Sequence, residues 1–162
     1  MVSSATSPVS DHDAILAVVD RFFEAYHAKD AEGMAATLTA DAAGRAVRVG
    51  PDGQARVTGD RPVADVIAQL ETLPEIVEVY WTPGVKVRGH LAQFWAPYVV
   101  EADGERLHCG IDAFTLVKIE GDWKLHSLDY TAEPHGCSDL GYRRDRENMR
   151  PASLVPRLAH PD

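Results

Sequence analysis

The strongest hydrophobic pattern in the chain lies near its start. Apolar residues recur there at the spacing of one helix face: Ile15, Val18, Val19, Phe22, Phe23 and Tyr26. Ser10 or Asp11 can cap the first turn, and Asp13 adds a negative charge where the helix dipole favours it. The pattern predicts a helix over residues 11–28, followed by a short second helix over 31–38.

Turn residues and short apolar runs fill the next part of the chain. The string Pro51-Asp52-Gly53 is a strong turn signal, and it separates two short strands expected at 44–49 and 55–58. Helical spacing then returns, which predicts a third helix over 61–73 with Asp60 as its N-cap.

Alternating apolar and polar residues dominate the region from 75 to 133 and indicate strands. Asp103-Gly104 connects two alternating runs and is a strong hairpin signal. Pro83 and Gly84 interrupt the first run, which predicts a bulge or bend that lets a sheet curl around a helix. The strands expected are 75–88, 91–102, 106–119 and 123–133.

This order of elements predicts an α+β fold. Three N-terminal helices would pack on one face of a strongly bent antiparallel sheet, forming a cone whose open mouth admits a ligand. The domain should span residues 11–137, after a flexible N-terminus at 1–10. We expect an irregular arm at 138–162, either mobile or laid across a partner subunit.

Several strings resemble the nuclear-transport-factor-2-like superfamily, in particular its SnoaL-like branch of polyketide-cyclase-like and ketosteroid-isomerase-like proteins. The resemblance covers about residues 10–133. It implies a cystatin-like fold and a homodimer, but it is poorly specific for function. The strings that carry it are residues 19–30, 34–41, 108–116 and 121–125.

One part of the resemblance is sharper. Ile111-Asp112-Ala113-Phe114 is similar to the ketosteroid isomerase strand that carries a protonated aspartic acid in the oxyanion hole, and Asp112 matches that position. The other two functional positions depart from the family. Phe22 stands where the family has a tyrosine, and Arg45-Ala46 stands near the position of its catalytic base. A base would therefore have to come from elsewhere.

Strand pairing offers a partner for Asp112. A tight turn at Glu120-Gly121 places Asp129 directly across from Asp112, and two inward carboxyls at that range raise one pKa. The pair could do general acid/base work, with His108 near the mouth as a proton shuttle. The hairpin at Asp103-Gly104 places Trp95 opposite Asp112 as an apolar wall.

Other arrangements remain open from the sequence. A shift of one residue breaks the pairing and sends Asp129 to solvent or to a partner subunit. Asp112 could instead be structural, hydrogen-bonded to a buried Tyr or Arg. Arg45 and Arg48 could reach the pocket, and pairing with Asp112 would lower its pKa.

These features favour cofactor-independent acid/base chemistry, of the isomerase, cyclase or dehydratase type, on a small apolar carbonyl compound. The alternative is a non-catalytic binding protein for a hydrophobic or aromatic metabolite; a purely structural dimerisation module ranks last. The residues expected to carry protons are Asp112, Asp129 and His108. Those expected to hold the substrate are Phe22, Tyr26, Trp81, Trp95, Phe114 and Ser127.

Composition narrows the class of protein. The formal net charge of −9 argues against a general nucleic-acid binder, although a basic patch lies at Arg143 to Arg150. No run of about 18 apolar residues exists to span a membrane. The start of the chain lacks the regions of a signal peptide, and no spacing suggests a metal or cofactor site. Two cysteines, Cys109 and Cys137, are too few for a disulfide framework, so reduced thiols in a cytoplasmic protein are expected, with a Cys109–Cys137 bridge as the alternative.

The outer face of the predicted sheet is too apolar to be exposed to solvent in a monomer. A twofold homodimer through this face would cover it. The residues assigned to it are Phe94, Tyr98, Val100, Ile111, Ala113, Val117, Leu128 and Tyr130.

Overall fold

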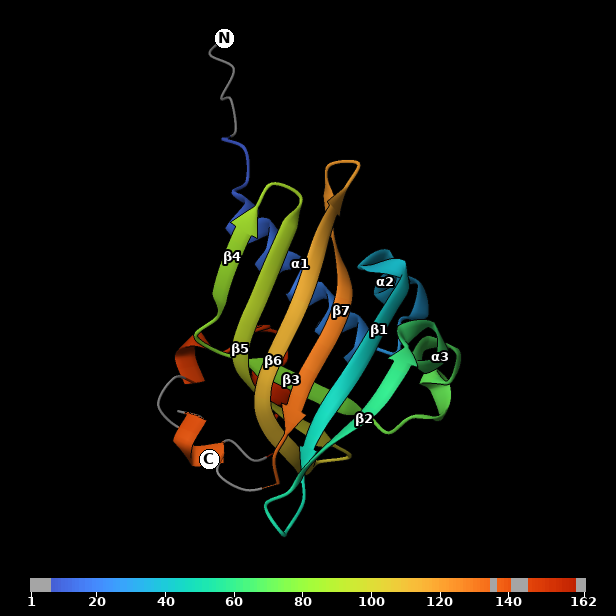
Figure 1. Ribbon diagram of the computed structural model, residues 1–162, viewed down its shortest axis with the longest axis vertical. Helices are drawn as coiled ribbons and strands as arrows, with labels where there is room; N and C mark the ends of the chain where they lie inside the picture. Colours follow the sequence, from blue (N-terminus) through green and yellow to red (C-terminus); the bar gives the residue numbers. More distant parts are fainter. Residues whose placement is uncertain (1–6, 135–136, 141–145, 160–162) are drawn as a thin grey trace.

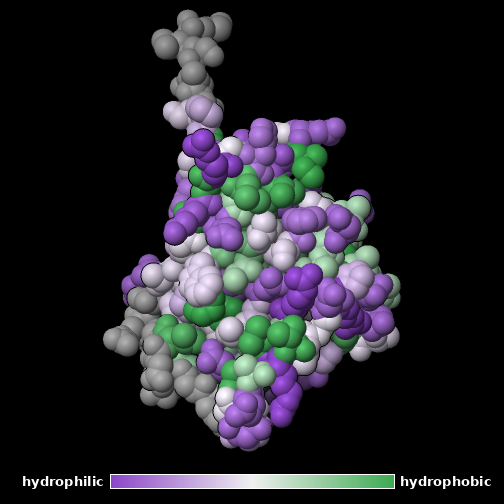
Figure 2. All heavy atoms as spheres, in the orientation of Figure 1, coloured by the Kyte–Doolittle hydropathy of each residue, from purple (hydrophilic) through white to green (hydrophobic). Residues whose placement is uncertain are grey.

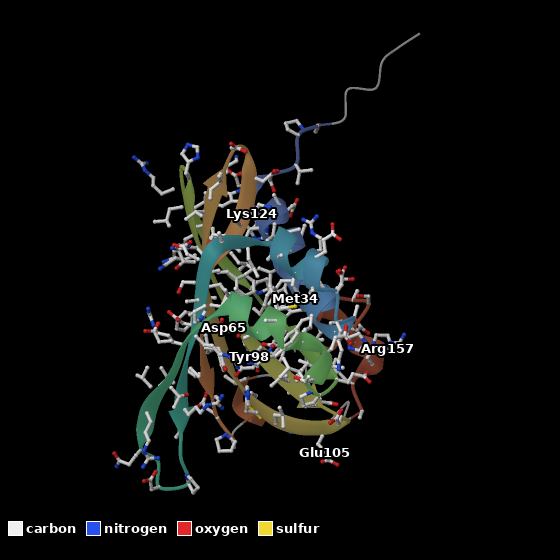
Figure 3. The ribbon with its side chains drawn as sticks, turned by 90° about the vertical axis from the view of Figure 1, so that its right-hand side faces the viewer. Met34, Asp65, Tyr98, Glu105, Lys124 and Arg157 are labelled. Carbon is white, nitrogen blue, oxygen red and sulfur yellow. A yellow bond between two sulfur atoms is a disulfide. The ribbon has the colours of Figure 1, made fainter. Side chains whose placement is uncertain are left out.

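The computed structural model describes residues 7–134, 137–140 and 146–159. Helices cover one face of a bent seven-stranded sheet (Figures 1 and 3). The helices are α1 (Asp11–His27), α2 (Ala31–Ala36) and α3 (Val63–Ala68), with short 3-10 turns at Leu70–Thr72, Cys137–Leu140, Arg146–Asn148 and Val155–Arg157. The strands are β1 (Leu38–Val49), β2 (Ala55–Pro62), β3 (Ile76–Tyr80), β4 (Gly84–Arg88), β5 (Leu91–Ala102), β6 (Glu105–Ile119) and β7 (Asp122–Ala132).

The first helix confirms the prediction closely. The Ser10 side chain accepts a hydrogen bond from the Asp13 backbone N–H at 3.1 Å, which caps α1. Its apolar face, including Ile15 and Val19 with no exposed area, packs into the core. The second helix is shorter than predicted and ends at Ala36, because the chain turns there into β1.

The sheet has the strand order β2-β1-β7-β6-β5-β3, with β4 also paired to β5. All neighbours are antiparallel except β1 and β7, which run parallel. The break predicted at Trp81 to Gly84 is present, and it divides the expected strand 75–88 into β3 and β4. Both halves pair with β5 in succession, so the bend lets the sheet wrap around α1.

The region after β1 differs from the prediction. Strand β2 continues to Pro62, because residues 61 and 62 pair with β1, and the helix expected over 61–73 is limited to α3 and a 3-10 turn. Asp60 does not cap that helix. It is the extra residue where the register between Gly44 and Arg45 shifts, and its φ of 53° is the left-handed conformation of a bulge.

The described residues 146–159 of the irregular arm expected at 138–162 pack against their own chain. Arg150 exchanges backbone hydrogen bonds with Tyr80, and its guanidinium binds the Asp20 carboxylate of α1 at 2.6 and 3.1 Å. Leu154 and Leu158 are buried in the core. The first residues of the expected flexible N-terminus (1–6) and of the basic patch (143–145) lie outside the described residues.

A disulfide joins Cys109 and Cys137, the arrangement that the sequence interpretation ranked below reduced thiols. Two cysteines are too few to predict a disulfide framework, and the sequence does not reveal that β6 and the 3-10 turn at 137–140 meet. Disulfides persist mainly in oxidising compartments, and the cytoplasmic location expected from composition stays a prediction. None of the helices in the described segments is long and apolar enough to cross a membrane.

The outer face of the sheet is less apolar than predicted. Figure 2, which views this face, shows polar and apolar residues interspersed, with the apolar ones in separate patches. Five of the residues assigned to the face instead point inward and line the core or the cavity: Phe94, Tyr98, Val100, Leu128 and Tyr130. Exposed apolar residues on the outer face include Trp95 at 60% and Leu91 at 51%.

Candidate functional site

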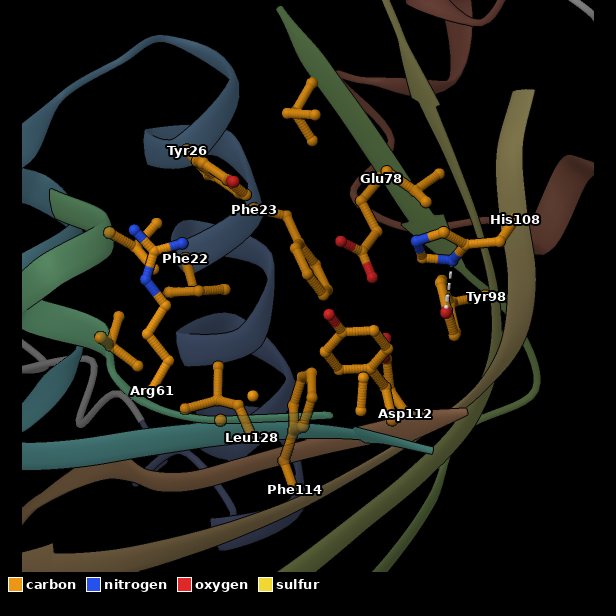
Figure 4. A pocket seen from close by; sticks show the side chains of 18 of the residues that line it. Phe22, Phe23, Tyr26, Arg61, Glu78, Tyr98, His108, Asp112, Phe114 and Leu128 are labelled. Carbon is orange, nitrogen blue, oxygen red and sulfur yellow. Dashed lines mark hydrogen bonds between the residues drawn. The ribbon is translucent and has the colours of Figure 1, made fainter. Parts of the chain in front are cut away.

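A cavity of about 550 Å³ lies between the inner face of the sheet and helices α1 and α3 (Figure 4). Its walls are mainly aromatic and aliphatic. The aromatic residues come from α1, β5, β6 and β7: Phe22, Phe23, Tyr26, Tyr98, Phe114 and Tyr130. A volume of this size holds a small organic molecule, and a few polar groups in an apolar wall can orient one.

Two carboxyl groups meet in this cavity, on Glu78 of β3 and Asp112 of β6. Their side chains are hydrogen-bonded to each other. Asp112 is 1% exposed, and its Oδ2 has no hydrogen-bond partner within the described part of the chain. Figure 4 shows the Glu78 carboxyl pointing into the cavity between Phe23 and His108. Asp112 therefore has one oxygen left for a ligand.

Burial decides the protonation of this pair. It raises the pKa of Asp112 well above its ordinary value, and the adjacent Glu78 carboxyl raises it further. Burial also raises the pKa of Glu78 to about 8, although the hydrogen bond with Asp112 acts in the opposite direction. Asp112 is thus the proton donor of the pair and Glu78 the group that ionises first. This is an acid beside a base in an apolar site.

A second polar network lies beside the pair. The Tyr98 hydroxyl donates to the Thr131 carbonyl at 2.5 Å, so it accepts from Nδ1 of His108 at 2.8 Å. Burial, with a smaller effect from Arg48, lowers the pKa of His108 to about 4. His108 is consequently a neutral imidazole with its proton on Nδ1, which makes it a poor proton shuttle near neutral pH.

Gly110 makes this network possible. It pairs with Tyr98 across the β5–β6 ladder, and a Cβ at this position would lie 2.3 Å from the carbonyl oxygen of Thr131. Only glycine permits β6 to approach the backbone of Thr131 so closely.

The predicted pairing of Asp112 with Asp129 is wrong. The register is as predicted next to the turn, where Leu116 pairs with Leu125, but it shifts before Thr115 pairs with Ser127. His126 is the extra residue of this bulge. Asp112 therefore faces Tyr130, while Asp129 lies opposite Ala113 on the outer face of the sheet.

A second bulge displaces Trp95. The β5–β6 register shifts between Val100 and Glu101, with Leu107 as the extra residue. Ala96 rather than Trp95 is then opposite Asp112, and Val100 rather than Val99 is opposite His108. Trp95 points away from the cavity.

The remaining predicted contact residues divide into two groups. Phe22, Tyr26 and Phe114 line the cavity, as predicted. Trp81 is buried in the core, where its indole N–H donates to the Leu140 carbonyl at 2.7 Å. Ser127 lies near Asp129 on the outer face, because the bulge at His126 reverses the faces of the residues that follow it.

Glu78 is the site residue that the sequence interpretation missed. Alternation in β3 did carry a signal, since Val77 and Val79 share one face and Glu78 lies on the other between Ile76 and Tyr80. A carboxylate within a run of buried apolar residues is costly unless it is paired, and that could have marked it. Its partner could not be found without the β3–β5–β6 register.

The described residues contain no group of three or more His, Cys, Asp or Glu that could hold a metal ion. A second hollow, on the outer face, is lined by Trp95, Ala113, Thr115 and Asp129, among others. One buried oxygen of Asp129, Oδ1, has no hydrogen-bond partner within the described segments.

Known proteins match this chain in structure and not in sequence. No protein-family model matches it, and no curated protein matches its sequence. A Mycobacterium tuberculosis protein of unknown function is 18% identical with a TM-score of 0.61, and the match covers 90% of this chain and 88% of that one. NTF2-like proteins described as having a cystatin-like fold also match, one of them from Novosphingobium aromaticivorans at 17% identity and a TM-score of 0.58, covering 79% of this chain and 85% of that one. The chain has the α+β cystatin-like fold of NTF2-like proteins.

Some structures with this NTF2-like fold carry provisional names as enzymes. One from Streptomyces avermitilis, provisionally named a dehydratase, is 17% identical with a TM-score of 0.56 and covers 77% of this chain and 97% of its own. Another, from N. aromaticivorans and provisionally named a scytalone dehydratase, is 16% identical with a TM-score of 0.57, covering 75% and 83%. Identities this low establish the fold alone, so the function must be argued from the cavity.

Proposed function

We propose that this protein carries out cofactor-independent acid/base chemistry on a small apolar carbonyl compound held in the cavity, in the manner of a SnoaL-like isomerase, cyclase or dehydratase. The observation that carries the proposal is the hydrogen-bonded pair of half-buried Glu78 and buried Asp112. Glu78 takes the place that the sequence interpretation gave to Asp129, as the carboxyl partner of Asp112, and it acts as the base. Asp112 keeps its predicted role as a neutral hydrogen-bond donor.

The chemistry follows from the protonation of the pair. Ionised Glu78 removes a proton from the carbon next to the substrate carbonyl, and the electron pair of that C–H bond moves onto the carbonyl oxygen. Protonated Asp112, whose single O–H is hydrogen-bonded to Glu78 in the structure, turns that O–H to the developing oxyanion and donates a hydrogen bond to it. Glu78 then returns its proton to another carbon, or to a leaving hydroxyl, which gives isomerisation or dehydration respectively.

The surroundings of the pair support this assignment. The apolar wall formed by Phe22, Phe23 and Phe114 keeps the carboxyl groups away from bulk water, and this is what raises both pKa values. Tyr26 and Phe22 can pack against the hydrocarbon part of a substrate. His108 contributes a neutral imidazole that positions the Tyr98 hydroxyl.

The test is proton exchange on a simple ketone. The protein is incubated in D2O with 2-tetralone, and loss of the α-proton signals is followed by NMR over a range of pH. We expect exchange above the buffer rate that rises with pH through about 8, as Glu78 ionises. Binding of the ketone, seen by saturation-transfer NMR, with no exchange at any pH would overturn the enzymatic proposal and support the binding-protein alternative.

The homodimer through the outer sheet face stays a proposal. Trp95 and Leu91 are the exposed apolar residues on this face that a partner would cover. Analytical ultracentrifugation of the wild-type protein and of Trp95→Lys tests it. A dimer that Trp95→Lys dissociates is the expected result, and a wild-type monomer at high concentration would contradict it.

A further inference from the structure

Two arginines line the open end of the cavity, Arg48 of β1 and Arg61 of β2. Both side chains are exposed, whereas Asp112 is buried, so the cavity runs from a cationic entrance to a carboxyl-lined interior. Figure 4 shows Arg61 beside Tyr26 and Phe22, across the cavity from Glu78 and His108.

Neither guanidinium has an acidic partner within the described residues. Arg48 donates to the Thr58 hydroxyl at 3.1 Å, and Arg61 donates to the Gln69 amide oxygen at 3.0 Å. Both partners are neutral. These bonds use only part of each guanidinium, which has five N–H donors.

Two other arginines on the same strands behave differently. Arg45 of β1 is paired with Asp60 at 3.0 Å, and Arg56 of β2 is paired with Asp52 at 3.5 Å. Acidic residues outnumber Lys and Arg by 25 to 16 in this chain. Of the four arginines of β1 and β2, the two that lack an ion pair among the described residues are the two that face the cavity.

The carboxyl pair does not account for these arginines. Burial and the mutual interaction of Glu78 and Asp112 govern the pKa of both groups, with no contribution from either arginine. The charge of Arg48 instead opposes the burial-driven rise in the pKa of Tyr130. The charge of Arg48 therefore acts on groups that line the cavity.

We propose that Arg48 and Arg61 form an anion subsite, and that the natural ligand is amphipathic, with a carboxylate at the entrance and an apolar ring system inside. Planar guanidinium groups bind carboxylates through paired charge-assisted hydrogen bonds. The subsite deepens the proposed function, since it names the substrate class for the same cavity, but it does not depend on catalysis. The cavity volume of about 550 Å³ suits a body of two or three fused rings.

The experiment compares two probes of the same shape, anthracene-2-carboxylate and anthracene-2-carboxamide. Their fluorescence is titrated with the full chain near neutral pH and at low ionic strength. We expect the carboxylate to bind about tenfold more tightly, the scale of one or two charge-assisted hydrogen bonds. Added salt should reduce this preference because the arginines are exposed.

Variants of the four arginines separate a subsite from general charge. Arg48→Gln/Arg61→Gln should remove the carboxylate preference and leave carboxamide binding unchanged. The matched control, Arg45→Gln/Arg56→Gln, alters the same two strands and removes the same charge, and it should keep the preference. Equal binding of the two probes, loss of the preference in the control as well, or a parallel loss of both probes in Arg48→Gln/Arg61→Gln would each overturn the subsite.

This result is distinguishable from failure of the proposed function. The carboxylate preference is a binding ratio, whereas the catalytic proposal is tested by proton exchange. A protein that prefers the carboxylate but exchanges no proton has the subsite without the chemistry. A protein that exchanges protons but binds both probes equally has the chemistry without the subsite.

Discussion

Asp112 and Asp129 lie on neighbouring strands of one sheet, yet they occupy opposite faces and different environments. Asp112 is buried in the cavity, hydrogen-bonded to Glu78, with a raised pKa. Asp129 lies on the outer face beside Trp95, in a hollow with no second carboxyl group among its described lining. Residue type does not distinguish them; a single extra residue, His126, does.

Both faces of the sheet thus carry an aspartate, and burial raises the pKa of the one on the inner face. An acidic group becomes a candidate catalyst only where a second carboxyl and an apolar wall meet it. Four comparisons, most of them between a variant on the inner face and one on the outer face, test this difference.

The largest effect should come from removing the proposed base. Glu78→Gln should lower the rate of ketone proton exchange by about 10²–10⁴-fold, because general-base catalysis contributes on this scale. Asp129→Asn, on the outer face, should change the rate by less than about twofold on the same scale. Deuterium exchange followed by NMR measures both. Comparable losses in the two variants would show that the faces are not functionally distinct.

Adjacent aromatic residues of β5 offer the next comparison. Phe94 is 1% exposed and contacts the rings of Tyr80 and Phe114 at centroid distances of 5.0 and 5.5 Å, while Trp95 is 60% exposed. Phe94→Ala should cost about 3–5 kcal/mol of unfolding free energy, and Trp95→Ala less than about 1. Urea denaturation measures both values. The same variant tests the dimer proposal, because a large cost for Trp95→Ala would mean that a partner subunit covers Trp95.

The carboxyl pair should also make stability depend on pH. Both groups hold protons in the folded chain at pH values where the unfolded chain has lost them, so the folded state loses stability as pH rises. His108 has the opposite effect on stability, because its pKa is lowered in the folded chain and the unfolded chain binds the proton more tightly. This effect is confined to pH values below about 6.5. Between pH 6.5 and 8, stability should fall by up to about 1.4 kcal/mol per pH unit for each carboxyl.

Thermal denaturation checks this window. The melting temperature of the wild type should fall more steeply than that of the Glu78→Gln/Asp112→Asn variant, which lacks both titrating groups. Parallel curves would mean that the pair titrates at ordinary values and that its apolar surroundings do not control it.

The smallest expected change in unfolding free energy comes from removing side-chain hydroxyl groups. Tyr98→Phe removes the bond to the Thr131 carbonyl and the acceptor for His108, and it should cost about 1–3 kcal/mol for the buried groups left unpaired. Thr115→Val, on the outer face, should stay within about 0.5 kcal/mol. Chemical denaturation separates them, and equal costs would place the Tyr98 network among the dispensable contacts.

The parts of the fold that the sequence predicted well are those set by local patterns. The helix over α1, the hairpin turn at Asp103-Gly104 and the bend near Pro83 each depend on residues close together in the chain. The faces of β6 were also correct, with His108, Asp112 and Phe114 inward. Errors began where a ladder lost or gained a residue, at Leu107 and His126, because alternation cannot reveal an unpaired residue.

The sequence predicted the type of candidate site, a carboxyl pair that includes Asp112, but not the second residue of the pair. The predicted pairing of the last two strands gave Asp112 a carboxyl partner, and the structure has one, but it is Glu78 of β3. The disulfide was missed for a similar reason, since Cys137 meets Cys109 only through tertiary contact. Long-range register, not residue chemistry, was the missing information.

The bulge at His126 has a consequence for how such a cavity can change over time. A regular ladder that kept His126 would turn Ser127 and Asp129 into the cavity and Leu128 and Tyr130 out of it. Loss of His126 would instead place Ser127 directly after Leu125 in a regular ladder, so the same side chains would still face the cavity. In a fold that serves many activities, this strand can therefore lose one residue at the bulge without exchanging its side of the ligand site.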